Sequence, residues 1–148
     1  MKKLLLPFLL FSSMATFAQS EPQRIIDEFF YRYKYKTPDE AVDYLFGTNK
    51  YMAKSTEQVE NVKYKLNSAI TLMGKYYGYD PLRKKTAGEN LVIYTFLVRY
   101  DRQPIRFNFT FYKANDQWVI FHYSFDDSIA EELKEATKIT SLKDNLDR

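Results

Sequence analysis

Residues 91–126 read LVIYTFLVRYDRQPIRFNFTFYKANDQWVIFHYSFD, and this stretch decides the fold. It holds three runs, 91–100, 105–113 and 117–126, in which β-branched and aromatic residues alternate with polar ones. Alternation with a period of two is typical of half-buried strands. Short polar segments separate the runs, with turn tips at Arg102-Gln103 and Asn115-Asp116. The pattern predicts an antiparallel β-meander.

The turns decide which side chains share a face of this meander. With an even number of residues in each loop, Phe109 lies opposite both Phe96 and His122. One face is then almost wholly apolar, and we expect helices to cover it: Val92, Tyr94, Phe96, Val98, Ile105, Phe107, Phe109, Phe111, Trp118, Ile120 and His122. The other face mixes polar and apolar side chains: Thr95, Leu97, Arg99, Arg106, Asn108, Thr110, Tyr112, Val119, Phe121, Tyr123 and Phe125.

Helix signals precede the sheet. Proline is well tolerated at the first position of a helix, and apolar residues at helical spacing follow Pro22. Two further segments open with a Ser or Thr three residues ahead of Glu or Gln, which is a capping box. Glycine is the usual residue after a helix end. The two helices with capping boxes are therefore predicted to begin near Thr37 and Ser55 and to end at Gly47 and Gly74.

The remaining elements complete an α+β fold. Residues 82–86 predict a short first strand, and the tyrosine-rich segment 76–79 predicts a loop. A capping box at 128–131 predicts a short C-terminal helix through about residue 138. The expected architecture is a set of N-terminal helices packed on a twisted antiparallel β-meander of about four strands, followed by this short helix.

The N-terminus indicates export. Lys2 and Lys3 precede an apolar segment too short to span a bilayer, and small residues precede a cut near Ala18-Gln19. We therefore expect a signal peptide over 1–18, one domain over 19–138 and a flexible tail over 139–148. The mature protein is expected to be periplasmic or secreted and not embedded in a membrane.

Composition limits the chemistry. The sequence contains no cysteine and one histidine, so disulfides, thiolate metal sites, a cysteine nucleophile and a histidine metal cluster are excluded. We expect neither a metal nor a cofactor. The net charge of +3 includes Lys2 and Lys3, so the mature chain carries only +1. Nearly neutral charge without a basic patch argues against nucleic-acid binding.

Several residues are candidates for a site. Arg99, Arg106, Tyr112 and Tyr123 share the mixed face, where they could bind an anionic or sugar ligand or form a dimer surface. A second set comprises His122 and Tyr94, which the predicted register places on the apolar face as lining for a pocket. A lone histidine on an apolar face is more often a hydrogen-bonded core residue than a catalyst. No catalytic residue is named.

Element order and several segments resemble a known superfamily. The segments are 41–46 (AVDYLF), 100–107 (YDRQPIRF) and 111–113 (FYK), together with Trp118 and 125–127 (FDD). Over roughly residues 22–138 the chain resembles small exported bacterial members of the nuclear-transport-factor-like superfamily, the α+β cone that includes ketosteroid-isomerase-like and cystatin-like domains. The resemblance implies this fold, but it carries no site residue, because this fold hosts enzymes, binders and dimerisation modules.

Three functional hypotheses follow. The first is an exported, non-catalytic binding or assembly module that forms a homodimer through the mixed face and could also take a small-molecule, sugar or protein ligand. The second is an isomerase-like or hydrolase-like enzyme with a small-molecule pocket between helices and sheet, which would need a carboxylate base near Tyr94. The third is a protein inhibitor or immunity-type partner.

Overall fold

The computed structural model describes the backbone of residues 21–146 and the side chains of residues 21–138. Its elements confirm the predicted α+β class and run in the order α1 (Glu21–Tyr35), α2 (Pro38–Gly47), α3 (Thr56–Met73), β1 (Tyr76–Ala87), β2 (Leu91–Tyr100), β3 (Ile105–Lys113), β4 (Trp118–Asp126) and α4 (Ile129–Leu146). The predicted signal peptide, residues 1–18, lies outside the described residues.

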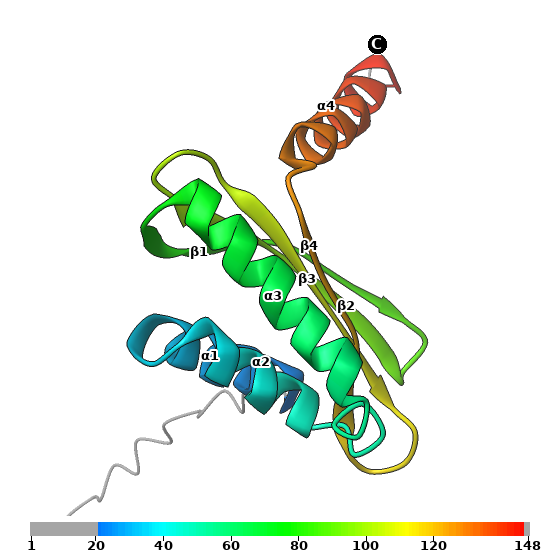
Figure 1. Ribbon diagram of the computed structural model, residues 1–148. Coiled ribbons are helices and arrows are strands. Elements are labelled where there is room, and N and C mark those ends of the chain that lie inside the picture. The colour runs from blue at the N-terminus through cyan, green and yellow to red at the C-terminus, as the bar shows by residue number, and fades with distance from the viewer. Residues whose placement is uncertain (1–20, 147–148) are drawn as a thin grey trace, which may run out of the picture.

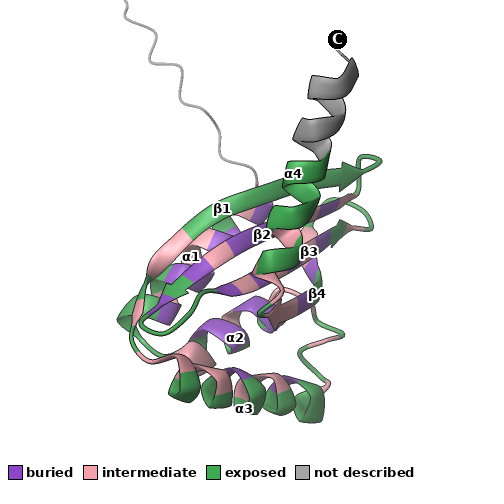
Figure 2. Cartoon of the chain, turned by 90° about the horizontal axis from the view of Figure 1, so that it is seen from above, coloured by how far each residue is buried: buried purple, intermediate pink, exposed green. Residues whose placement is uncertain are grey.

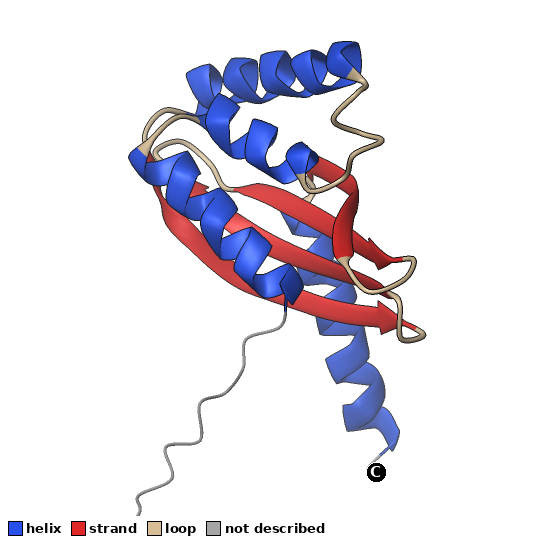
Figure 3. Cartoon of the chain, turned by 90° about the horizontal axis from the view of Figure 1, so that it is seen from below, coloured by secondary structure: helices blue, strands red, loops and turns tan. Residues whose placement is uncertain are grey.

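The four strands form one antiparallel sheet in the order β1-β2-β3-β4, as Figure 1 shows. Helices α1, α2 and α3 lie on one side of this sheet, which we call the inner side, whereas α4 projects from the other, outer side (Figure 3). α3 packs against α2 and lies farther from the sheet than α2 does (Figure 2). Among the described residues, no helix combines the length and the apolar character needed to cross a bilayer.

The helix boundaries follow the local signals. Thr37 Oγ1 accepts a hydrogen bond of 3.1 Å from the backbone N–H of Glu40, and Pro38 occupies the first turn of α2. Gly74 ends α3 with a φ of +88°, in the left-handed region that favours glycine. Ser55 is the N-cap of α3, although its side chain makes no capping hydrogen bond.

The first strand is longer than predicted, and the segment expected to be a loop belongs to it. β1 begins at Tyr76 and pairs with β2 along its whole length. It is an edge strand, so Pro81, which has no N–H to donate, costs the sheet little. Two register irregularities, after Tyr76 and after Pro81, explain why residues 76–81 lack the plain alternation of a strand.

The strand registers differ from the prediction in two ways. Between β2 and β3 the pairing is displaced by two residues, so Phe96 lies opposite Phe107 instead of Phe109. An even displacement leaves every side chain on its predicted face. Between β3 and β4 a bulge follows the predicted Phe111–Ile120 pair, and Phe109 lies opposite Tyr123 rather than His122.

The bulge exchanges the faces of two candidate residues. Tyr123 was predicted on the mixed face, but it is buried in the core at 6% exposure. His122 was predicted on the apolar face, but it is exposed on the outer side, where it pairs with Thr110. Both predictions were wrong, because one extra residue in β4 reverses the alternation of all that follows.

The inner side of the sheet carries an aromatic core, and buried segments of the strands and helices face one another there (Figure 2). Phe107, Phe109 and Phe111 are fully buried, as predicted. From α1, the ring of Phe29 lies 5.1 Å from that of Phe109, and Phe30 stacks on Tyr79 at 3.7 Å. The space between helices and sheet is therefore occupied by packed rings.

The last helix begins against the sheet and then leaves it. The sequence predicts its end near residue 138, whereas the backbone stays helical to Leu146. Its first turn is held by Glu132, which bonds to Arg83 and Arg106 on the outer side of the sheet. Leu133 is 64% exposed, and α4 extends away from the strands (Figures 1 and 3).

Candidate functional site

The outer side of the sheet carries three adjoining hollows of about 290, 240 and 340 Å³. The first two share Lys85, Ile93 and Thr110, and the last two share Ala87 and Leu91. They therefore form one depression, which we call the outer groove. Its polar end comprises Arg83, Thr95, Arg106, Asn108, His122, Ser124 and Glu132, and its apolar end comprises Ala87, Leu91, Ile93, Tyr112 and Phe121.

An ion-pair network closes the polar end. Arg106 bonds to Asp126 from β4 and to Glu132 from α4, with N···O distances of 3.0 Å to each carboxylate. Arg83 from β1 also contacts Glu132, at 2.5 Å. The hydrogen bond to Asp126, followed by the charges of both acids, raises the pKa of Arg106. Arg106 therefore holds α4 on the sheet. Because two carboxylates already occupy its guanidinium, it is poorly placed to bind an external anion.

Beside the network, the floor of the groove is polar. Thr95 is buried, and its Oγ1 donates a hydrogen bond of 2.9 Å to Asn108 Oδ1. The side chains of Lys85, His122 and Ser124 make no hydrogen bond or ion pair to any other described residue. This part of the face can therefore still accept polar contacts from a partner.

At the apolar end of the groove, two large aromatic side chains are exposed to solvent. Phe121 is 58% exposed and Tyr112 is 43% exposed, and their ring centroids are 6.4 Å apart. Leu91 and Ile93 of β2 continue this surface and are half-buried. Contiguous exposed apolar surface rimmed by polar residues marks interaction sites in soluble proteins.

The structure brings together only part of the predicted sets. Arg106 and Tyr112 both line the outer groove. Arg99 lies outside it, paired with Asp80 at 3.0 Å. Tyr94 is on the inner face with Lys84 Nζ 5.3 Å from its ring centroid, so Tyr94 and His122 are on opposite sides of the sheet. They cannot form one pocket.

Near Tyr94, a hollow of about 370 Å³ opens between the start of α1 and strands β1 and β2. Its lining includes Gln23, Tyr79 and Lys84 but no carboxylate. Isomerase-like chemistry requires a carboxylate base within reach of the substrate. The residues that line this hollow therefore do not supply the acid that the enzyme hypothesis needs.

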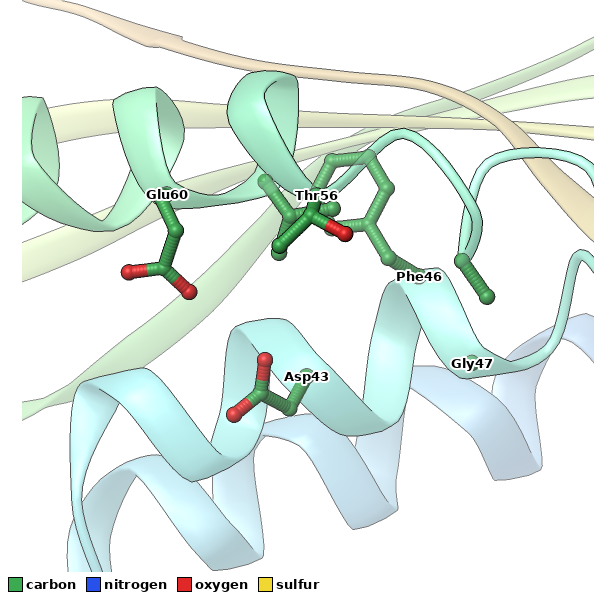
Figure 4. A pocket seen from close by; sticks show the side chains of 7 residues that line it. Asp43, Phe46, Gly47, Thr56 and Glu60 are labelled. Atoms are coloured by element: carbon green, nitrogen blue, oxygen red, sulfur yellow. The ribbon is translucent and has the colours of Figure 1, made fainter.

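Another hollow, of about 130 Å³, lies between α2 and α3 (Figure 4). The carboxylates of Asp43 and Glu60 point into the gap between the two helices. Lys63 Nζ contacts both, at 2.6 Å and 2.8 Å, and the hydrogen bond to Asp43 is the main cause of its raised pKa. Lys63 thus partners both carboxylates, and its pair with Asp43 joins α3 to α2.

Metal binding finds no support in residues 21–138. Within that range no three His, Asp or Glu side chains are grouped closely enough to hold a metal ion.

Sequence reasoning missed several residues of the outer groove. Lys85, Ala87, Leu91 and Ile93 were not named as candidates, although they line it. A signal was available, because Leu91 and Ile93 are apolar at positions that alternate away from the core. Apolar residues on the nominally exposed face of a strand indicate a second contact surface.

Comparison of the chain with protein-family models, with curated proteins and with solved structures finds no match. The resemblance to the nuclear-transport-factor-like superfamily stays a prediction. Function must therefore be argued from the geometry described above.

The burial of Tyr123, which the sequence did not predict, gives a first testable prediction. Its hydroxyl is buried and has no hydrogen-bond partner in the described part of the chain. A buried polar group without a partner costs about 1–3 kcal/mol. We expect Tyr123→Phe to raise the free energy of unfolding by about 1 kcal/mol, measured by urea denaturation.

Tyr33→Phe is the matched control for this measurement. Its hydroxyl is also buried, but it is hydrogen-bonded to Tyr100. Removing it should lower stability by about 1 kcal/mol. Equal losses in both variants would show that the Tyr123 hydroxyl has a hydrogen-bond partner in solution and would contradict its unpaired state.

Proposed function

We propose that this protein is an exported, non-catalytic binding or assembly module that forms a homodimer through the outer groove. The exposed pair Phe121 and Tyr112, at the apolar end of the groove, is the observation that carries the proposal. Export rests on the predicted signal peptide, and dimerisation rests on this surface.

The inner side of the sheet supports a non-catalytic role. A small-molecule enzyme of this architecture would hold its substrate between the helices and the sheet. Phe29, Phe107 and Phe109 fill the centre of that space and are fully buried, and the hollow near Tyr94 has no carboxylate in its lining. Phe121 and Tyr112 remain exposed on the outer side, and a second copy of the chain would bury them.

A self-association of this kind fits the symmetry of common dimers. In a two-fold dimer, the same patch on each subunit meets its counterpart, so the patch must complement itself. The outer groove has a polar region with Lys85 and His122 and an apolar region with Phe121. Aromatic residues at the centre of an interface contribute most of the binding energy in such contacts.

The test is the oligomeric state of residues 19–148 by sedimentation equilibrium over a range of concentrations. The wild type should form a concentration-dependent dimer. Phe121→Asp should weaken the dimer by about 100-fold or more, because truncating a central aromatic residue costs at least about 2 kcal/mol and a buried charge adds to this. Arg106→Glu is less suitable, since it would also break the intramolecular pairs with Asp126 and Glu132.

Tyr51→Asp is the matched control. Tyr51 is 73% exposed in the connection between α2 and α3 and lines none of the three hollows of the outer groove. This variant should dimerise as the wild type does. A wild type that remains monomeric at all concentrations, or a Phe121→Asp variant that dimerises unchanged, would contradict the proposal.

A further inference from the structure

Beyond its first turn, the described part of α4 leaves the sheet of its own chain. Described residues from Leu133 to Lys138 are exposed, and α4 extends away from the strands on the outer side (Figure 3). An isolated helix of this length is only marginally stable in water, because most helical stability comes from packing of an apolar face. We therefore expect another surface to cover the apolar face of α4.

The first half of α4 has a face suited to docking. Ile129, Leu133 and Ala136 recur at spacings of four and three residues and so lie on one side of the helix. Glu131, Glu132 and Glu135 make this half of the helix acidic, against Lys134 and Lys138.

The outer groove complements that helix in charge. β1 presents the cations Arg83 and Lys85 to the outer groove, where both line its polar end. Glu132 already binds Arg83 and Arg106 of its own chain, which shows that acids of α4 fit the cations of this face. Beyond those contacts lies the apolar end of the groove, where Phe121 and Tyr112 are exposed.

The area of the sheet also argues for a contribution from α4. Strands of nine residues are roughly 30 Å long, and four of them at a spacing of about 4.8 Å give a face of roughly 600 Å². Stable interfaces bury about 800 Å² on each partner. Two outer faces packed together would therefore bury less area than a stable interface needs, and a docked helix adds the missing area.

The position of α4 also supports its contact with a second copy of the chain. α4 starts at the polar end of the groove, where Glu132 bonds to Arg106, and projects from the outer side of the sheet, on which a second copy would pack (Figure 3). In a two-fold arrangement the polar end of one groove can lie against the apolar end of the other.

We infer that the homodimer is built by reciprocal helix docking: α4 of each copy inserts Leu133 and its neighbours into the apolar end of the other copy's outer groove. The inference rests on the proposed homodimer and specifies which segment of the second copy occupies the groove.

Cysteine cross-linking tests this directly, because the chain contains no cysteine of its own. One chain carries Leu133→Cys on α4, and a second chain of different mass carries Ala87→Cys, at a position that lines the apolar end. Both chains span residues 19–148, and they are mixed and oxidised under mild conditions. We expect the mixed disulfide to form about 100-fold faster than in a control mixture, because docking holds the thiols at millimolar effective concentration.

The control mixture pairs Leu133→Cys with Tyr51→Cys, which is exposed away from the outer groove. A disulfide requires Cα atoms within about 7 Å, so random encounters give only slow background linkage. A Leu133→Asp variant, which changes an exposed residue and should leave the fold intact, is expected to weaken the dimer by about tenfold or more.

The possible failures are distinguishable. If the wild type sediments as a dimer but the mixed disulfide forms only at the control rate, or if only Ala87–Ala87 disulfides form, helix docking is wrong and the homodimer stands. If the wild type is monomeric, the proposed function and this inference are both overturned.

Discussion

Phe109→Ala is expected to lower the free energy of unfolding by about 3–5 kcal/mol, the usual cost of truncating a buried phenylalanine. Phe109 is at the centre of the inner face and is fully buried. Its ring lies 5.1 Å from that of Phe29 and 5.1 Å from that of Tyr123, with further rings at 5.8 Å and beyond. Such a loss is a large part of the 5–15 kcal/mol that stabilises a typical domain.

Urea denaturation followed by circular dichroism measures this effect. Phe109→Leu, with an expected loss of about 1–2 kcal/mol, keeps the effect measurable if the alanine variant does not fold. Tyr64→Ala is the control, because Tyr64 is 73% exposed on α3 and its truncation should change stability by less than about 0.5 kcal/mol. Similar losses at the two positions would show that Phe109 is not a core residue.

The position of Phe109 was predictable from alternation alone. The register between β2 and β3 differs from the prediction by two residues, yet Phe107, Phe109 and Phe111 all face inward as expected. The face on which a side chain lies depends only on whether the register is displaced by an odd or an even number of residues. Its partner on the next strand depends on the length of the turn. Alternation therefore predicts a face more safely than it predicts a partner.

The bulge in β4 shows where that reasoning fails and how it could be improved. Residues 118–121 are four consecutive apolar residues, whereas residues 121–126 alternate between apolar and polar. Up to Ile120 the inward residues of β4 have even numbers, and beyond it Tyr123 and Phe125 take the inner side. A break of this kind is the sequence signal of an extra residue in a strand, and it places Tyr123 inside and His122 outside.

The network that holds α4 could not have been predicted. Glu132 lies 26 residues from Arg106 and contacts it only because β3, β4 and the start of α4 meet at one end of the sheet. Arg83 joins from the opposite edge strand. Charged pairs at the surface leave no periodic pattern in a sequence, so this part of the outer groove required the three-dimensional arrangement.

Alkaline solution is expected to unfold the protein steeply above pH 10. Three core tyrosines, Tyr33, Tyr100 and Tyr123, are each 6–7% exposed. Burial raises the pKa of Tyr100 to about 12, raises that of Tyr33 further with the help of Tyr100, and raises that of Tyr123 well above its usual range. The folded protein therefore keeps these three protons at pH values where the unfolded chain releases them.

The sign of the effect follows from proton linkage. Below pH 10 both states are protonated, and these groups give no dependence on pH. Above pH 10 the unfolded state binds fewer protons, so the free energy of unfolding falls with rising pH. Each group contributes about 1.4 kcal/mol per pH unit, and three groups give about 4 kcal/mol per unit until the folded pKa values are reached.

Tyrosinate absorbance and circular dichroism, recorded together during an alkaline titration, test this expectation. The buried tyrosines should ionise only as the secondary structure is lost. Tyr123→Phe removes one of the three groups and should reduce the slope by about 1.4 kcal/mol per pH unit, whereas Tyr51→Phe at an exposed position should not change it. Ionisation of all thirteen tyrosines near pH 10 with the fold intact would contradict the burial of Tyr33, Tyr100 and Tyr123.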